Sequence, residues 1–375
     1  MKQFLLTLLL FGFLCLNGIG VPFAESNSFS RIEWPKTDFN KRSIKLEEIL
    51  SGGPPKDGIP AIDTPSFISV VSAQNWLSDF EPVISVEING KAKAYPLQIL
   101  MFHEIVNDDL NGKAISVTFC PLCNTSIVFS RWVNGQKLDF GTTGRLRNSD
   151  LIMYDRQTES WWQQFTGEAL IGSYTGTQLE ELTSQIVSFN TFYTQYPDGQ
   201  VLSRKTGFSR QYGKNPYRGY DDINNTPFLM RGQIDDRLPP MERVLSVTTE
   251  KNAKIYPFSV LTESNVFPDV LGNISLVIFN TGQIYSALDA STIRQSKTVP
   301  AYTVFSTEIE AQTLHFYWQN NSIYDRETSS KWNVMGKAVD GKLKGKQLKP
   351  MKQGVHFAFA WLAFNPDVEI YRQSN

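Results

Sequence analysis

Two closely spaced cysteines are the residues of this chain best suited to chemistry. Cys120 and Cys123 lie within the segment Thr118-Phe-Cys-Pro-Leu-Cys-Asn-Thr125. Such a pair can hold zinc or copper as thiolates, cycle between dithiol and disulfide, or form a static disulfide. Thioredoxin-type pairs lie at a helix N-terminus, whereas the residues after Cys123, Asn-Thr-Ser-Ile-Val-Phe, are typical of a strand. The pattern therefore favours a metal-binding turn between two strands.

A structural tetrahedral zinc site needs four ligands, and the cysteine pair supplies two. His103 is the candidate for the third metal ligand. The segment Gly141–Asp150 contains glycines, hydroxyl groups and two arginines, and we expect a loop there. Such a loop either is merely solvated or binds an anion and shapes access to the site. Further candidate site residues are Met101, Glu104, Arg145, Asn148, Asp150 and Met153.

An internal repeat indicates which residues serve the framework. Met153-Tyr-Asp-Arg-Gln-Thr-Glu-Ser-Trp-Trp162 matches Ile323-Tyr-Asp-Arg-Glu-Thr-Ser-Ser-Lys-Trp332, and Ala92-Lys-Ala-Tyr-Pro96 echoes Ala253-Lys-Ile-Tyr-Pro257. The sequence thus predicts two copies of one β-rich unit, at residues 65–225 and 226–375. Residues present in one copy only are the better functional candidates.

The thiols and the histidine are present in the first copy only. The alignment sets Cys120 opposite Asn280 and Cys123 opposite Gln283, and it sets His103 near position 264. We therefore expect the second copy to be a scaffold without the site.

The first copy also contains an insertion. Twelve residues separate Phe140 from Met153, but only six separate the matching Phe316 from Ile323. The extra residues fall in the segment Gly141–Asp150, close to the candidate site.

The N-terminal residues predict export. Lys2 precedes an apolar run from Phe4 to Leu16, which is long enough for a signal peptide but too short for a membrane span. We expect a signal peptide at residues 1–24, or alternatively an uncleaved anchor, and no later membrane span. Residues 25–64 are predicted to form an extended lead-in with a Gly/Pro-rich loop at 51–60.

Composition limits the remaining possibilities. Hydrophobic residues make up 41% of the 375 residues, the net charge is −1, and aromatic residues reach 13%. These values predict a globular, β-rich α+β protein, mainly antiparallel with short helices, that does not bind nucleic acid. No phosphate-loop or dinucleotide-binding motif is present, so no nucleotide cofactor is expected.

Three segments carry a resemblance to a known family. His103-Glu-Ile-Val-Asn-Asp108, Thr118–Thr125 and Arg147-Asn-Ser-Asp-Leu-Ile-Met-Tyr-Asp-Arg-Gln-Thr-Glu-Ser160 resemble the domain-of-unknown-function 3179 (DUF3179) family over roughly residues 50–375. The resemblance implies an exported or membrane-associated protein without an assigned activity. It supports the choice of His103, Cys120 and Cys123. Asn124 differs from the glycine that relatives often have after the second cysteine.

We therefore expect an exported protein that binds one copper or zinc ion through Cys120, Cys123 and His103. One alternative is an envelope thiol oxidoreductase with Cys120 as the attacking thiol and His103 as its base. Another is a binding module with a small structural disulfide. The sequence leaves open whether the protein is an enzyme, and it suggests a metal-transfer or redox partner in the envelope.

Overall fold

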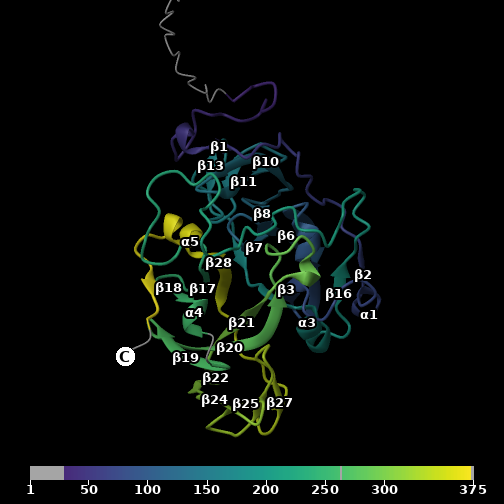
Figure 1. The fold of residues 1–375 in the computed structure, drawn as a ribbon, viewed down its shortest axis with the longest axis vertical. Helices are drawn as coiled ribbons and strands as arrows, with labels where there is room; N and C mark the ends of the chain where they lie inside the picture. The colour runs from purple at the N-terminus through teal and green to yellow at the C-terminus, as the bar shows by residue number, and fades with distance from the viewer. Residues whose placement is uncertain (1–28, 262–263, 373–375) are drawn as a thin grey trace, which may run out of the picture.

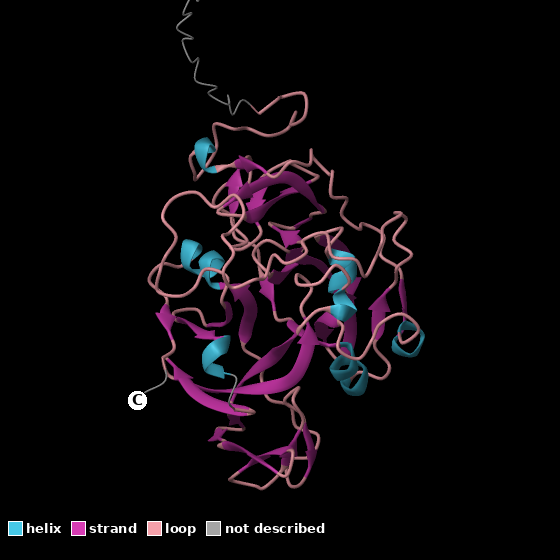
Figure 2. Cartoon of the chain, viewed as in Figure 1, coloured by secondary structure: helices cyan, strands magenta, loops and turns pink. Residues whose placement is uncertain are grey.

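The structure is a computed structural model that describes residues 29–261 and 264–372. The predicted signal peptide at residues 1–24 lies outside the described residues. The described part of the chain forms 29 strands, five α-helices of four to seven residues and two 3-10 turns. Figure 2 shows strands throughout the body, with short helices among and around them. The predicted β-rich α+β class, with mainly antiparallel pairing, is confirmed.

The N-terminal half contains three sheets and a small ribbon. The first sheet has the order β15 (Gln185–Ser188), β3 (Pro82–Ile88), β4 (Lys91–Pro96), β16 (Gln200–Leu202), β2 (Phe67–Ser69). The second has the order β14 (Glu181–Leu182), β7 (Thr125–Ser130), β6 (Lys113–Cys120), β5 (Ile105–Leu110). The third has the order β1 (Leu50–Ser51), β10 (Phe140–Arg147), β11 (Asp150–Asp155), β12 (Trp161–Gln163), β13 (Ala169–Ile171). The ribbon pairs β8 (Trp132–Val133) with β9 (Gln136–Lys137), and the helical elements are η1 (Leu46–Glu48), α1 (Val70–Ala73), α2 (Leu97–Leu100) and α3 (Phe189–Gln195).

The C-terminal half has a similar arrangement, with three sheets and a small ribbon. Its first sheet has the order β28 (Lys352–Phe357), β17 (Arg243–Thr248), β18 (Ala253–Pro257), β29 (Glu369–Ile370). Its second has the order β19 (Val266–Leu271), β20 (Ile274–Tyr285), β21 (Thr298–Ser306), and its third β24 (Phe316–Gln319), β25 (Ser322–Asp325), β26 (Lys331–Trp332), β27 (Ala338–Asp340). The ribbon pairs β22 (Glu308–Ile309) with β23 (Gln312–Thr313), and the helical elements are α4 (Phe258–Leu261), η2 (Ile293–Gln295) and α5 (Ala358–Phe364).

Two of the side chains shared by the repeat segments, an aspartate and a tryptophan, have the same contacts in both halves. Asp155 accepts a backbone N–H three residues ahead, from Thr158, and the indole N–H of Trp162 at 3.0 Å. Asp325 accepts the indole N–H of Trp332 at 2.9 Å in the same way. These residues serve the framework in each half. A duplication as the origin of the two halves stays a prediction.

Turn chemistry explains why the strands end where they do. Asn89 and Gly90 both have positive φ, at 50° and 80°, and they join β3 to β4. A two-residue turn of this kind matches the twist of antiparallel strands and requires positive φ at both positions, which Asn and Gly adopt readily. Asn134 and Gly135 form the same turn between β8 and β9.

One hydrophobic cluster spans the two halves. It includes Phe119 and Met153 from the N-terminal half together with Ile255, Phe357 and Leu362 from the C-terminal half. The two halves therefore share a core. Figure 1 shows β28, in yellow, beside β17 and below β7, where the halves meet.

A long segment joins the halves. Between the end of β16 at residue 202 and the start of β17 at residue 243 there is no helix or strand. We call residues 203–242 the connecting segment. Among the described residues, no helix has the length and apolar character needed to cross a bilayer.

Candidate metal centre

The cysteine pair lies in a β-hairpin turn. Cys120 ends β6 and pairs with Thr125, the first residue of β7. The turn between them is closed by a hydrogen bond from the Asn124 N–H to the Pro121 carbonyl at 3.2 Å. Asn124 has φ of 50°, a conformation that asparagine and glycine adopt most easily. The departure from glycine at this position is therefore compatible with the turn.

A second hairpin brings a carboxyl group to the thiols. Asn148 and Ser149, with φ of 50° and 65°, form the turn between β10 and β11, and Asp150 is the first residue of β11. One ligand atom each of Cys120, Cys123 and Asp150 lie within 4.8 Å of one another, and all three residues are buried. The structure thus unites two predicted ligands with a residue that the sequence offered as an additional candidate.

The expected anion-binding loop at Gly141–Asp150 is not a loop. Residues 140–147 form β10, which pairs with β11 across a bulge between Thr142 and Arg145. Gly144 has φ of +70°, and a Cβ atom there would lie 1.9 Å from the Pro54 carbonyl oxygen, so this position requires glycine. Because a strand pairs its backbone N–H groups with its neighbours, few remain to bind an anion. That expectation was wrong.

The insertion instead lengthens the hairpin that carries Asp150. In the C-terminal half the matching hairpin, β24 and β25, is shorter and turns at Asn320 and Asn321, which also have positive φ. Both hairpins begin from an equivalent pair, Phe140 with Asp155 and Phe316 with Asp325. The extra residues therefore extend the first hairpin far enough for its tip to reach the cysteine turn.

Backbone hydrogen bonds shift the alignment of the two halves by one residue. The Phe119 N–H donates to the Glu104 carbonyl at 2.8 Å, and the Asn280 N–H donates to the Asn265 carbonyl at 3.0 Å. Asn280 therefore corresponds to Phe119, and the position of Cys120 is taken by Thr281. The main conclusion is unchanged, because no cysteine lies at that position in the C-terminal half.

Only one of the two carboxyl oxygens of Asp150 accepts hydrogen bonds from nitrogen donors. Its Oδ2 accepts the Gln163 side-chain N–H at 2.7 Å and the Phe165 backbone N–H at 2.9 Å. Its Oδ1 is buried without a nitrogen or oxygen partner among the described residues, and the two thiols are weak donors toward this carboxyl. Burial raises the pKa of Asp150 to about 7.

Both cysteines are free thiols in a buried environment. Burial raises the pKa of Cys120, and burial together with Cys120 and Asp150 raises the pKa of Cys123 well above its usual value. The Cys120 thiol has a weak contact of 3.9 Å with the Ser149 carbonyl. A catalytic redox cysteine needs a lowered pKa, so this environment does not activate a thiolate.

Glu104 is a second buried carboxyl group beside the thiols. Burial and the charge of Asp150 raise the pKa of Glu104 to about 8, while a hydrogen bond from Tyr217 opposes the shift. The charge of Glu104 in turn contributes to the raised pKa of Cys120. Glu104 also has φ of 57°, a strained conformation for a glutamate, and such strain is found disproportionately at functional sites.

An apolar cavity of about 280 Å³ adjoins the carboxyl group of Glu104. Its lining includes Tyr217 and Tyr220 from the connecting segment. Burial raises the pKa of Tyr220 to about 12, and the charges of both thiols contribute to that shift. Glu104 and the two tyrosines therefore form the wall of the cavity that faces the cysteine turn.

His103 is not part of the cluster. Its Nδ1 lies 2.7 Å from the Pro60 carbonyl and its Nε2 lies 2.7 Å from the Tyr212 hydroxyl. Because a carbonyl can only accept, Nδ1 carries the proton and Nε2 accepts from Tyr212. Burial lowers the pKa of His103, which keeps the ring neutral. With both nitrogens hydrogen-bonded elsewhere, His103 does not join the two thiols, and the residue that lies with them is Asp150.

The remaining candidates have structural explanations. Met101 and Met153 are buried in the main hydrophobic cluster. The Arg145 guanidinium lies 5.5 Å from the centre of the Phe29 ring. Asn148 occupies a positive-φ position of the hairpin turn.

The C-terminal half supports the cysteine turn directly. The Phe357 N–H donates to the Cys123 carbonyl at 3.0 Å. His356 lies between Thr125 and Ser246, with each ring nitrogen 2.9 Å from a hydroxyl. The sequence repeat gave no signal of this contact, because neither residue belongs to a matched segment.

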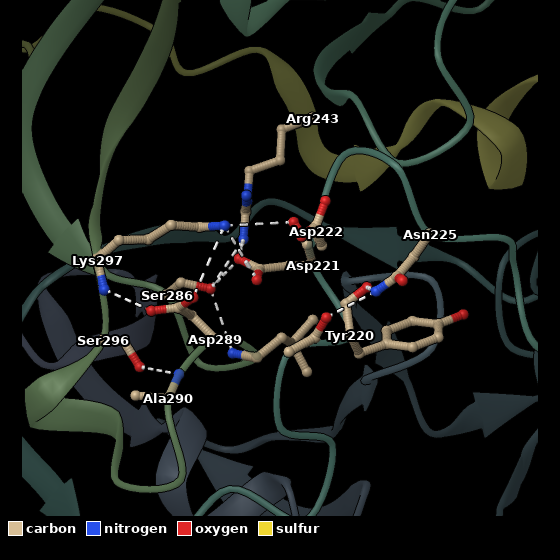
Figure 3. A network of polar contacts seen from close by, with 12 residues as sticks. Tyr220, Asp221, Asp222, Asn225, Arg243, Ser286, Asp289, Ala290, Ser296 and Lys297 are labelled. Atoms are coloured by element: carbon tan, nitrogen blue, oxygen red, sulfur yellow. Dashed lines mark hydrogen bonds and ion pairs between the residues drawn. The ribbon is translucent and has the colours of Figure 1, made fainter.

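The C-terminal half also holds the two tyrosines in place. The Gly219 N–H donates to the Asp289 carbonyl at 2.7 Å, and the Tyr220 N–H donates to the Leu288 carbonyl at 3.1 Å. The next residue, Asp221, is buried and pairs with Arg243 at 2.6 Å. Ser286 and Lys297 complete this polar network, which Figure 3 shows beside Tyr220. Local sequence patterns do not reveal these contacts, since they join segments far apart in the chain.

The fold and the site define a strand-rich α+β protein with two buried thiols and two buried carboxyl groups beside an apolar cavity. The chain belongs to the family described as protein of unknown function (DUF3179), whose sequence profile matches residues 56–368. The resemblance found in the sequence is thereby confirmed. No curated protein and no solved structure matches the chain significantly.

Proposed function

We propose that this protein binds one zinc ion through Cys120, Cys123 and Asp150. The observation that carries the proposal is the buried group of three ligand atoms within 4.8 Å, in which one Asp150 oxygen has no nitrogen or oxygen partner. A buried polar atom without a partner costs free energy, and a cation at this position would supply the partner.

The charge of the cluster also favours a cation. Two thiols and two carboxyl groups lie together in a buried environment, and the main causes of their raised pKa values include no lysine or arginine. Ionising such groups side by side is unfavourable unless a positive charge joins them. A bound metal ion is the largest local charge that a site can have and reverses this preference.

The ligand set suits zinc better than copper(I). Zinc accepts thiolate sulfur and carboxylate oxygen in one tetrahedral site. Copper(I) prefers soft ligands alone, and a carboxylate is a hard ligand. Three protein ligands leave a fourth position open, as in catalytic rather than structural zinc sites.

Export is part of the proposal, and it rests on the N-terminal sequence. In an oxidising compartment a neighbouring thiol pair tends to form a disulfide. Metal coordination would keep Cys120 and Cys123 reduced there.

Metal analysis of anaerobically purified mature protein tests the proposal. We expect one zinc per chain in the wild type and none in a Cys120→Ser variant that remains folded by circular dichroism. Copper in place of zinc in the protein as purified would identify copper as the metal. A metal-free protein whose thiol pair titrates at a mild reduction potential would support the oxidoreductase alternative and refute metal binding.

A further inference from the structure

The cavity beside Glu104 has no role in holding a metal ion, because none of the three ligand residues lines it. We propose that the cavity binds a small, uncharged and mostly apolar molecule whose hydroxyl or carbonyl oxygen lies at Glu104. The contact of this oxygen with the metal rests on the proposed function, whereas the binding of the apolar part does not.

The walls determine the apolar part of the ligand. Most of the lining is aliphatic or aromatic, and the volume of about 280 Å³ is close to the lower end of small-molecule pockets. The lining also includes Arg145, whose guanidinium lies over the Phe29 ring, a residue that does not line the cavity. A charged group placed against the apolar walls would lose its hydration without a partner. The apolar lining includes Ile59, Leu122, Leu146, Leu151 and Phe228.

Glu104 and Tyr217 determine the polar head group of the ligand. Glu104 and Tyr217 are joined by a hydrogen bond and both line the cavity, so polar atoms are concentrated in this part of it. Leu122, which lies between the two cysteines, lines the same cavity, so the cavity adjoins the cysteine turn. A ligand oxygen at Glu104 would therefore have a hydrogen-bonding partner in the part of the cavity that adjoins the cysteine turn.

Charge excludes the ionised alternatives. Two thiolates and one carboxylate around a divalent ion leave a net charge of −1, so the site repels an anionic head group. An ammonium group has no lone pair to give to a metal. A neutral alcohol or carbonyl compound satisfies both conditions.

Isothermal titration calorimetry with three probes of equal tail length tests the inference. The probes are 1-hexanol, hexanoate and hexylammonium, titrated into metal-free and zinc-loaded full-length mature protein. We expect 1-hexanol to bind at least about tenfold more tightly than the two charged probes, a difference of about 1.4 kcal/mol. No saturable binding, or equal binding of all three probes, overturns the inference.

Two variants connect binding to the cavity. Leu146→Phe fills the cavity without changing a proposed ligand, and it should weaken 1-hexanol binding at least about tenfold. Phe228→Ala removes an aromatic side chain that lines the cavity and should also weaken 1-hexanol binding. Because Phe228 is exposed, this variant should fold even if Leu146→Phe does not. Val339→Phe, at an exposed position of the C-terminal half, is the matched control and should bind like wild type. Unchanged affinity in folded Leu146→Phe and Phe228→Ala would refute the assignment.

The contact with the metal has a separate readout. In cobalt-substituted protein, 1-hexanol should change the visible cobalt absorption, and this change should disappear in Glu104→Gln while cobalt remains bound. If the protein takes up no metal but metal-free protein binds 1-hexanol in the cavity, the proposed function fails and the cavity assignment stands. If metal binds and 1-hexanol does not, the cavity assignment alone fails.

Discussion

The carboxyl group of Asp150 and the thiol of Cys120 lie within 4.8 Å of each other, although the two residues belong to different sheets. Cys120 ends β6 of the second sheet, and Asp150 begins β11 of the third. The proposed metal centre is thus formed by two hairpin tips that meet inside the N-terminal half.

Replacement of Asp150 should separate the structure-based ligand set from the one expected from the sequence. Asp150→Asn removes the anionic oxygen ligand, and we expect zinc affinity to fall by more than the roughly 10–100-fold typical of losing an outer-shell partner. The matched variant, His103→Gln, should retain zinc with nearly unchanged affinity, because both nitrogens of His103 are already hydrogen-bonded. Competition titration against a chelator measures both. Loss of zinc in folded His103→Gln with retention in Asp150→Asn would reverse the assignment.

Zinc binding should strengthen as the pH rises. The pKa of Asp150 is raised to about 7 and the pKa of Cys120 is also raised, in both cases mainly by burial. Zinc must displace the protons from its ligands, so affinity increases with pH through this range. Calorimetry in buffers of different ionisation enthalpy counts the protons released. Binding that is independent of pH between 6 and 8 would contradict the proposed ligands.

The metal-free protein should lose stability as the pH rises from 4 to 8. The pKa of Asp150 is 3.8 in a model peptide and about 7 in the fold. The protonated Asp150 carboxyl therefore contributes on the order of 4 kcal/mol to the free energy of unfolding. This contribution is complete below pH 4 and is lost as the pH rises through 7. Asp150→Asn should remove this part of the pH dependence, as measured by urea unfolding at several pH values. Asp198→Asn, at an exposed turn, serves as the control. If the free energy of unfolding changed with pH equally in the wild type and both variants, Asp150 would not be the cause.

Gln163 should act on the metal through Asp150. Its side chain donates to Asp150 Oδ2 at 2.7 Å and orients the carboxylate. Gln163→Leu should weaken zinc binding roughly 10–100-fold while the stoichiometry stays at one ion per chain. The corresponding position in the C-terminal half is Asn333, and Asn333→Leu should leave zinc affinity unchanged. An equal effect of both variants would indicate a general loss of stability instead.

The ion pair behind Tyr220 should stabilise the fold without holding the metal. Asp221→Asn removes the buried carboxylate from its pair with the partly buried Arg243, and breaking such a pair typically costs about 3–5 kcal/mol. Asp235→Asn breaks a pair of partly exposed side chains with Arg237 and should cost less than about 1 kcal/mol. Chemical unfolding gives both values. Zinc stoichiometry should remain one in the folded Asp221→Asn variant, and equal costs for the two variants would contradict the structural role.

The hairpins and the cysteine turn could be predicted because their determinants are local. Asn89-Gly90 specifies a two-residue turn, and the strand-like residues on both sides of Cys120 and Cys123 specify the strands that meet there. Each of these signals lies within a few residues of the element that it determines.

Asp150 could be named but not ranked above His103. Both residues are plausible ligands by type, and the choice depends on which one the fold brings to the thiols. The length of β10 decides this, and its strand character was hidden by glycines and threonines that favoured a loop. Tyr217 and Tyr220 were missed altogether, because the connecting segment has no periodic pattern and its position depends on residues 286–297.

The hydrogen bond from Phe357 to the Cys123 carbonyl has a consequence for the order of biogenesis. A ribosome completes the cysteine hairpin more than two hundred residues before it makes β28. Until that strand docks, the Cys123 carbonyl lacks its Phe357 donor. Completion of the cysteine turn therefore belongs to the end of folding, after the last part of the polypeptide has emerged.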